Sequence, residues 1–333
     1  MSKRLRMAVI GAGRMGGFHA RACAESRDVE LVAVVDTVAT QALAVARKHN
    51  VAGLSSVEAL GDRLDAAVIA VPTVAHLAVA GPLLERGVSC LVEKPLAATS
   101  AEAARLVKAA SKGNSTLQVG HSERFNPAFM ALARYQLKPR FIEATRVSPC
   151  RFRSMDIGVV MDMMIHDIDL VLSLVPSEVV SVDAVGVNVV AATEDMANVR
   201  VRFANGCVAD LIASRAALKV ERRIRIFAES GYASVDFGAK RGTFVRPSAR
   251  LTALRQAAMA TGHFDPAGVA DTEYEKLLEV EQIEINDHDA LSRQLAAFVA
   301  SARDGEPVVV SGDDGRRAVE LAEQIVRAIQ LGH

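Results

Sequence analysis

The sequence predicts an α/β protein of two domains, a doubly wound parallel sheet followed by an α/β domain with a predominantly antiparallel open sheet. Over about the first 120 residues, short apolar runs alternate with helical patterns, which is typical of a parallel sheet covered on both faces. Farther along, period-two strands follow one another through short turns, which indicates antiparallel pairing. We predict domains at 1–121 and 122–333, with the last helix packing back on the first domain.

The first domain is organised around a glycine-rich stretch. The run 7–10 has the character of a buried strand, and a G-x-G-x-x-G pattern and a helical pattern follow it. In this pattern the first glycine permits a tight turn, the second lets backbone approach a pyrophosphate, and the third lets the helix pack on the strand. The pattern predicts a Rossmann nucleotide site with the diphosphate at the helix N-terminus. The predicted contacts are Gly11, Gly13, Arg14, Met15 and Gly16.

An acidic residue closes the second strand of this unit. Asp36 follows the apolar run 31–35 and lies twenty residues past Gly16, where it can accept hydrogen bonds from a ribose diol. Its charge would repel a 2′-phosphate, so we predict NAD rather than NADP as the cofactor.

The rest of the first domain continues the alternation. Ser100 is expected to cap its helix, since a serine side chain can accept a hydrogen bond from a free N–H group of the first turn. The predicted helices are 40–50, 75–86 and 100–110, and the predicted strands are 65–71, 89–92 and 116–119.

The second domain shows hairpins and two closing helices. Asn205 and Gly206 form a strong turn signal between two of its strands. The stretch 239–274 has no clear period, and we interpret it as loop and irregular helix. The predicted strands are 199–203, 207–214, 223–226 and 233–237, and the predicted helices are 288–303, led by Asp287, and 314–331, led by Asp313.

Composition describes an ordinary globular protein. Half of the residues are hydrophobic and the formal net charge is +0, so no global field favours nucleic acid or an anionic membrane. The four cysteines are scattered, which predicts reduced structural thiols. The apolar stretch before the glycine loop is too short for a signal peptide, and no later run reaches transmembrane length. We therefore expect a cytoplasmic protein.

Two predicted strands end in residues suited to a ligand edge, because a parallel sheet binds ligands at the carboxyl ends of its strands. Pro72, Thr73 and, shortly after, His76 follow the strand 65–71. The strand 89–92 is followed by Glu93 and Lys94, and then by a proline that stiffens the exit. We predict cofactor contacts at both strand ends: Pro72, Thr73, His76, Glu93 and Lys94. A lysine at a strand end is usually a solvated charge, but its neighbours here indicate a functional role.

A polar stripe lies on an otherwise apolar helical pattern. Asp162, His166 and Asp169 share one face at helical spacing, among methionine, isoleucine and leucine. Such a stripe is costly when buried unless it is partnered or functional. Three other interpretations stay open: a solvated face, a satisfied core histidine, or a metal site. No further histidine or cysteine cluster supplies a third metal ligand, so we predict no metal.

A third polar cluster, residues 121–127, joins the two predicted domains. Arginines in and after it could face an anionic group of the substrate, such as a diphosphate. Most surface arginines have no such role. The arginines are Arg124, Arg146, Arg151 and Arg153, and Asn126 lies in the same cluster.

These residues together resemble the glucose–fructose oxidoreductase, inositol dehydrogenase and MocA family over essentially the whole chain. The resemblance rests on the glycine pattern, Asp36, Glu93-Lys94-Pro95 and the stripe that begins at Asp162. It implies an NAD-dependent dehydrogenase, a homodimer or homotetramer formed through the second sheet, and a small-molecule sugar substrate. It also implies that Lys94, Asp162 and His166 are catalytic. His166 is the better candidate base, because an unperturbed histidine titrates near neutral pH, and Lys94 would then stabilise the alkoxide. The sequence leaves open that the two residues exchange these roles. The predicted substrate contacts are Arg124, Asn126, Arg153 and Asp169.

The resemblance also suggests a subgroup. E-R-F-N-P, M-D-M-M-I-H-D-I-D and F-A-N-G-C with A-S-R are similar to the enzymes that oxidise the 3-hydroxyl of UDP-N-acetylglucosamine for lipid A synthesis. A common family version has glycines around the aspartate, in the pattern G-x-H, whereas Met164 and Ile165 precede His166 in this chain, so the subfamily stays open. The alternatives are an inositol or hexose dehydrogenase, a biliverdin-reductase-like enzyme, or a non-catalytic NAD-binding regulatory protein.

Overall fold

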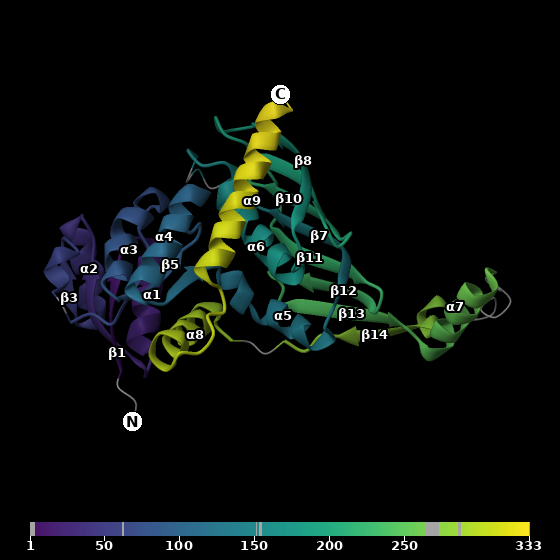
Figure 1. Ribbon diagram of the computed structural model, residues 1–333, viewed down its shortest axis with the longest axis horizontal. Helices are drawn as coiled ribbons and strands as arrows, with labels where there is room; N and C mark the ends of the chain where they lie inside the picture. The colour runs from purple at the N-terminus through teal and green to yellow at the C-terminus, as the bar shows by residue number, and fades with distance from the viewer. Residues whose placement is uncertain are drawn as a thin grey trace.

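The computed structural model of the chain describes residues 4–61, 63–150, 152, 155–263, 273–285 and 288–332. Figure 1 shows two sheets side by side, with the long C-terminal helix running along their junction. No helix within these residues is both long and apolar enough to cross a membrane.

The first sheet has six parallel strands in the order β3-β2-β1-β4-β5-β6, which confirms the doubly wound prediction. The strand order reverses between β1 and β4, and this is where such sheets open a crevice for a ligand. The strands are β1 (Leu5–Ile10), β2 (Val29–Val35), β3 (Ala52–Leu54), β4 (Ala66–Ile69), β5 (Ser89–Glu93) and β6 (Leu117–Gly120), and the helices are α1 (Arg14–Glu25), α2 (Ala39–His49), α3 (His76–Glu85) and α4 (Ser100–Gly113).

The second sheet has eight strands in the order β14-β13-β12-β11-β7-β10-β9-β8. All neighbours pair antiparallel except β7 and β10, so the predicted antiparallel character is confirmed. The strands are β7 (Pro139–Val147), β8 (Val179–Val187), β9 (Met196–Phe203), β10 (Val208–Ser214), β11 (Glu221–Ala228), β12 (Gly231–Asp236), β13 (Arg241–Pro247) and β14 (Leu278–Gln282).

Helices cover one face of this second sheet and leave the other open. Alternate strand residues such as Ile142, Val199 and Ile224 pack under Ile168 and Ile325 from two helices. An arm that ends in α7 projects from the β13–β14 edge (Figure 1), and none of its helical residues is buried. The helices are α5 (Pro127–Met130), α6 (Ile165–Leu174), α7 (Ala249–Thr261), α8 (Ala290–Asp304) and α9 (Gly312–Leu331).

The last two helices return to the first sheet. Phe298 of α8 is fully buried against Met7 and Val9 of β1. Glu323 of α9 accepts hydrogen bonds from the Ser100 backbone N–H, at 3.1 Å, and from its hydroxyl, at 2.6 Å. The two sheets are therefore fastened together by helices that follow both of them in the chain.

Several helix starts differ from the prediction. Thr99, rather than Ser100, caps α4 and accepts from Glu102 N at 3.2 Å. Ser311, rather than Asp313, caps α9, because Asp314 reaches back to complete a reciprocal pair of hydrogen bonds. Asp287 lies outside the described residues, and Asp289 caps α8.

The stretch 239–274 contains regular structure that was not predicted. It holds β13 and, after the cap Ser248, helix α7. Because α7 buries none of its residues, it has no apolar stripe from which a helical period could be recognised.

Candidate active site

A cavity of about 780 Å³ opens at the carboxyl ends of β1, β2 and β4 in the first sheet. It lies at the point where the strand order reverses, the expected position for a dinucleotide. Among its lining residues are six of the predicted cofactor contacts: Gly11, Gly13, Arg14, Met15, Asp36 and Pro72.

The glycine loop has the geometry that a diphosphate requires. Gly11 has φ +100°, and a Cβ there would lie 2.4 Å from the Ala70 carbonyl oxygen. A Cβ on Gly16 would lie 1.7 Å from the Gly11 oxygen, so helix α1 packs directly on the loop. At Gly13 a Cβ would meet nothing within 4 Å. The loop backbone therefore borders open space at a helix N-terminus that no side chain caps, which fits a bound diphosphate.

Asp36 is held in a fixed orientation beside this loop. Its Oδ2 accepts from Ala12 N at 2.7 Å and its Oδ1 accepts from Val38 N at 2.8 Å. Each carboxylate oxygen keeps a lone pair that can accept from a ribose hydroxyl. The residues present therefore fit NAD.

Five other predicted cofactor contacts lie outside the lining of this cavity. Besides Gly16 and Lys94, they are Thr73, which begins a short 3₁₀ turn, and the buried residues His76 and Glu93. The His76 ring lies 3.1 Å from Pro95 O through Nδ1 and 3.0 Å from Val71 O through Nε2. It thus joins the end of β4 to the segment after Lys94. Contact of these five residues with the cofactor stays a prediction.

Glu93 has a partner that sequence reasoning missed. His19 Nε2 lies 2.6 Å from Glu93 Oε1, and both side chains are enclosed. Burial works to raise the pKa of Glu93, but the His19 hydrogen bond and the nearby positive charges lower it overall. The sequence does contain a sign of this pair. His19 lies on the buried face of α1 with Ala20 and Cys23, and a buried histidine needs a hydrogen-bond partner.

Lys94 connects the first sheet to the turn that leads into α6. It follows β5, and its Nζ donates to the backbone oxygen of Asp162 at 2.8 Å and lies 3.6 Å from Asp162 Oδ1. Burial lowers the pKa of Lys94, while the charges of Asp162 and Glu93 favour the ammonium form. Residues predicted to act together from distant parts of the chain therefore meet in space.

The predicted polar helix begins in an unusual conformation. Val160–Met164 form a π-helical turn that continues into α6, so Asp162 lies in the π turn and His166 in the α-helix. Single π-helical turns are rare and often occur at functional sites. Here the turn carries the Asp162 carbonyl to which Lys94 binds.

His166 is an uncharged imidazole at neutral pH. Burial, followed by the positive charges of Lys94 and Arg146, holds its pKa well below the usual range. Its Nδ1 is enclosed and makes no hydrogen bond to any described residue. The ring can therefore accept a proton.

A second imidazole lies beside it. His121 follows β6, is fully buried, and meets the His166 ring edge-on, with ring centroids 6.5 Å apart. Neither of its ring nitrogens has a partner within the described part of the chain, and burial lowers its pKa. Both rings lie close enough to Lys94 for its charge to lower their pKa values further.

Three of the predicted substrate contacts bind protein groups. Arg124 and Asp169 form a two-point ion pair, at 2.8 Å and 3.0 Å. Asn126 caps α5 through Ala128 N, at 3.0 Å, and donates to Glu123. Their contact with substrate stays a prediction, and Arg153 lies outside the described residues.

Arg146 is enclosed between two acids and does not face an open site. It donates to both oxygens of Asp167, at 2.8 Å and 2.9 Å, and to Glu123 at 2.9 Å. Burial opposes its charge, but the two carboxylates outweigh this and raise the pKa of Arg146. Arg146, Asp167 and Glu123 thus join β7, α6 and the turn after β6, next to His166 in the chain.

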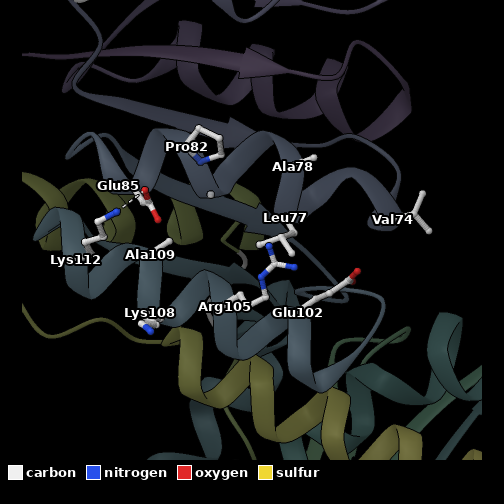
Figure 2. A pocket seen from close by; sticks show the side chains of 11 residues that line it. Val74, Leu77, Ala78, Pro82, Glu85, Glu102, Arg105, Lys108, Ala109 and Lys112 are labelled. Carbon is white, nitrogen blue, oxygen red and sulfur yellow. Dashed lines mark hydrogen bonds and ion pairs between the residues drawn. The ribbon is translucent and has the colours of Figure 1, made fainter.

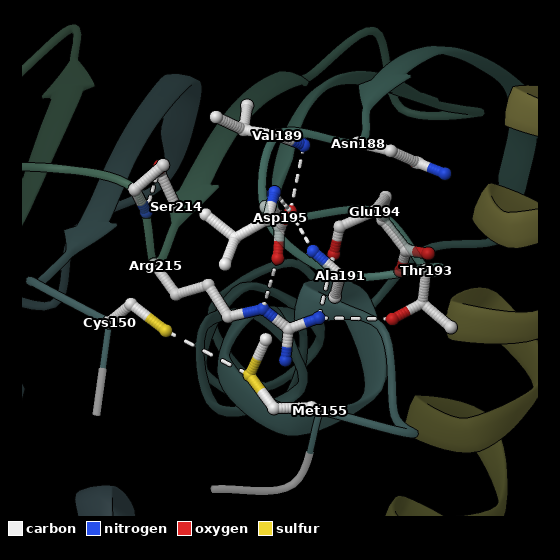
Figure 3. A network of polar contacts seen from close by, with 12 residues as sticks. Cys150, Met155, Asn188, Val189, Ala191, Thr193, Glu194, Asp195, Ser214 and Arg215 are labelled. Carbon is white, nitrogen blue, oxygen red and sulfur yellow. Dashed lines mark hydrogen bonds and ion pairs between the residues drawn. The ribbon is translucent and has the colours of Figure 1, made fainter. Parts of the chain in front are cut away.

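A second polar network fastens the segment that leads to Asp162 (Figure 3). Asp195 accepts from Arg215 Nε at 2.6 Å and from three backbone N–H groups of its own loop. Arg215 also donates to Ile157 O at 2.9 Å, and Glu194 accepts from the backbone N–H groups of Val159 and Val160. The loop 188–195 thereby fixes the start of the π turn.

A larger cavity, of about 960 Å³, lies elsewhere. Figure 2 shows it between α3 and α4, where Lys112 donates to Glu85 at 2.9 Å. None of the predicted site residues lines it, so we place no chemistry there. Within the described residues, no group of three or more His, Cys, Asp and Glu side chains could hold a metal ion.

Comparison with known families matches both domains. A model described as an oxidoreductase family with an NAD-binding Rossmann fold matches residues 5–121, and a GFO/IDH/MocA C-terminal domain matches residues 139–234.

Comparison with individual proteins finds relatives that match along almost the whole chain. UDP-N-acetylglucosamine 3-dehydrogenase of Acidithiobacillus ferrooxidans is 36% identical over 98% of this chain and 97% of its own. Its solved structure matches with a TM-score of 0.86, covering 98% of each chain. Inositol 2-dehydrogenase of Rhizobium meliloti is 27% identical over 98% of this chain and 97% of its own. GenD2 from gentamicin A biosynthesis, solved in complex with NAD, shares the fold at 22% identity, with a TM-score of 0.79 over 100% of this chain and 96% of its own.

Proposed function

Because this chain belongs to the GFO/IDH/MocA oxidoreductase family, we propose that it oxidises the 3-hydroxyl of UDP-N-acetylglucosamine. At the coarser level it is an NAD-dependent dehydrogenase that acts on a CH–OH group of a sugar. The observation that carries the finer proposal is the similarity to UDP-N-acetylglucosamine 3-dehydrogenase along both domains, at 36% identity. The product, a 3-keto nucleotide sugar, would supply an amino-sugar for lipid A.

The proposed chemistry assigns a role to each central side chain. NAD, when bound, supplies the electron chemistry by accepting a hydride. His166 takes the hydroxyl proton, since its ring is uncharged at neutral pH. Lys94 donates a hydrogen bond to the substrate oxygen and stabilises the negative charge that develops there. Asp162 holds the Lys94 ammonium through its backbone oxygen and its carboxylate.

A substrate panel tests the proposal against its main alternative. NADH formation is measured with UDP-N-acetylglucosamine, free N-acetylglucosamine and myo-inositol, and we expect the highest kcat/KM with the nucleotide sugar. Faster turnover of myo-inositol would instead favour the inositol dehydrogenase function, which the 27% identical relative supports.

The position of Asp36 predicts cofactor preference. NAD should bind at least tenfold more tightly than NADP, about 1.4 kcal/mol, because a 2′-phosphate would meet the carboxylate. Asp36→Ala should narrow this gap in a fluorescence titration. Tighter binding of NADP than of NAD by the unmodified protein would refute the assignment.

We also propose that the open face of the second sheet forms a homo-oligomer. Phe141, Phe227 and Tyr232 stack in a row on that face, with ring centroids 5.7 Å and 4.7 Å apart. In the next row Arg200 and Arg225 lie beside the acids Asp183, Asp210 and Glu143. Such a mixed surface suits a self-complementary contact. Light scattering should give a dimer or tetramer mass, and a value near the 35.4 kDa of one chain would contradict the proposal.

A further inference from the structure

One arginine beside the site has no carboxylate partner among the described residues. Arg222 lies on β11, opposite Arg146 of β7 in the sheet register. Side chains alternate along a strand, and Ile224 of the same strand is buried under the helices. Arg222 therefore projects from the face that Arg146 uses to reach α6.

The surroundings of Arg222 leave its charge available. Within the described part of the chain its guanidinium makes no hydrogen bond or ion pair, and the residue is exposed. Its positive charge works to lower the pKa values of His166, Asp167 and Glu123. Asp167 and Glu123 are already bound by Arg146. By contrast, Arg124 is committed to Asp169.

We propose that Arg222 binds the diphosphate of the nucleotide-sugar substrate while the sugar ring lies between Lys94 and His166. A guanidinium stays charged at working pH and offers paired N–H donors that match phosphate oxygens. A neutral sugar or inositol gives such a group nothing to bind. Arg222 thus selects an anionic sugar, an inference that rests on the proposed function and adds a residue to it.

The test compares Arg222→Gln and Arg222→Lys with a matched control, Arg105→Gln. Arg105 is also exposed, but it lies on α4 beside the outer cavity of Figure 2. Arg222→Gln should raise KM for UDP-N-acetylglucosamine by roughly ten- to a hundredfold, the effect of losing a charge-assisted hydrogen bond. The kcat and the Kd for NAD should change little, Arg222→Lys should recover part of the loss, and Arg105→Gln should match the unmodified protein.

Calorimetric titration of UDP into the protein–NAD complex separates this inference from the proposed function. If the unmodified protein does not oxidise UDP-N-acetylglucosamine, the proposed function fails, but the inference still requires UDP to bind and Arg222→Gln to weaken that binding. An unchanged KM in Arg222→Gln, an equal rise in Arg105→Gln, or no UDP binding by the unmodified protein would each overturn the inference.

Discussion

Lys94→Ala should lower kcat by roughly two to four orders of magnitude, the usual range for a positioned proton-transfer or charge-stabilising group. Its Nζ is held at the Asp162 carbonyl between the two sheets, and no other described lysine lies at that place. NAD affinity should change little, because the glycine loop and Asp36 lie at the other end of the cofactor site. Steady-state NADH formation and a fluorescence titration with NAD measure the two quantities. Lys112→Ala, which removes an exposed lysine bound to Glu85, is the control.

His166→Ala should cause a similar loss and change the pH profile. The pKa of His166 lies well below its usual range, so the ring is active at neutral pH and loses activity only as pH falls through that lowered pKa. The acid limb of kcat/KM should therefore lie below about pH 6.5, the ordinary histidine value, and vanish in His166→Ala. The double mutant should lose less than the product of the single losses, since both residues act on one proton. Near-normal turnover by either single mutant, with NAD still bound, would remove the mutated residue from the catalytic assignment.

Arg146→Met should destabilise the second domain by about 3–5 kcal/mol, the usual cost of removing one member of a buried charged cluster. The methionine fills most of the same volume, but Glu123 and Asp167 then remain enclosed next to each other without a cation. Chemical denaturation followed by circular dichroism measures the change in the free energy of unfolding.

The control for this variant is Arg246→Met, which breaks the exposed pair of Arg246 on β13 with Glu279 on β14 and should have little effect. Adding Glu123→Gln and Asp167→Asn to Arg146→Met should recover part of the lost stability, because the uncompensated charges are then removed. A loss below about 1 kcal/mol in Arg146→Met would show that water or movement relieves the two acids.

The cofactor half of the site could be predicted from the sequence because its signals are local. Strand, glycine turn, helix and Asp36 lie within one continuous unit, and each side chain acts close to its place in the chain. Lys94 and the stripe from Asp162 to Asp169 could also be found, since each is a polar departure from an apolar pattern. That Lys94 and Asp162 touch depends on the packing of two sheets and could only be proposed through family resemblance.

The features that were missed depend on partners far apart in the chain. Strand β7 was missed because Arg146 interrupts the apolar residues on its inward face. Arg146 can be buried there because Glu123 and Asp167 neutralise its charge. The pairing of Arg124 with Asp169 and the free charge of Arg222 follow from helix placement and strand register. Single-sequence patterns contain neither kind of information.

Transfer of deuterium from the sugar to NAD identifies the carbon that is oxidised. UDP-N-acetylglucosamine deuterated at carbon 3 is incubated with the unmodified protein and NAD, and the reduced cofactor is analysed by mass spectrometry. We expect NADH that carries the deuterium, and we expect Lys94→Ala to form it far more slowly. Unlabelled NADH would place the oxidation at another carbon, and no NADH from this substrate would contradict the assignment as a UDP-N-acetylglucosamine 3-dehydrogenase.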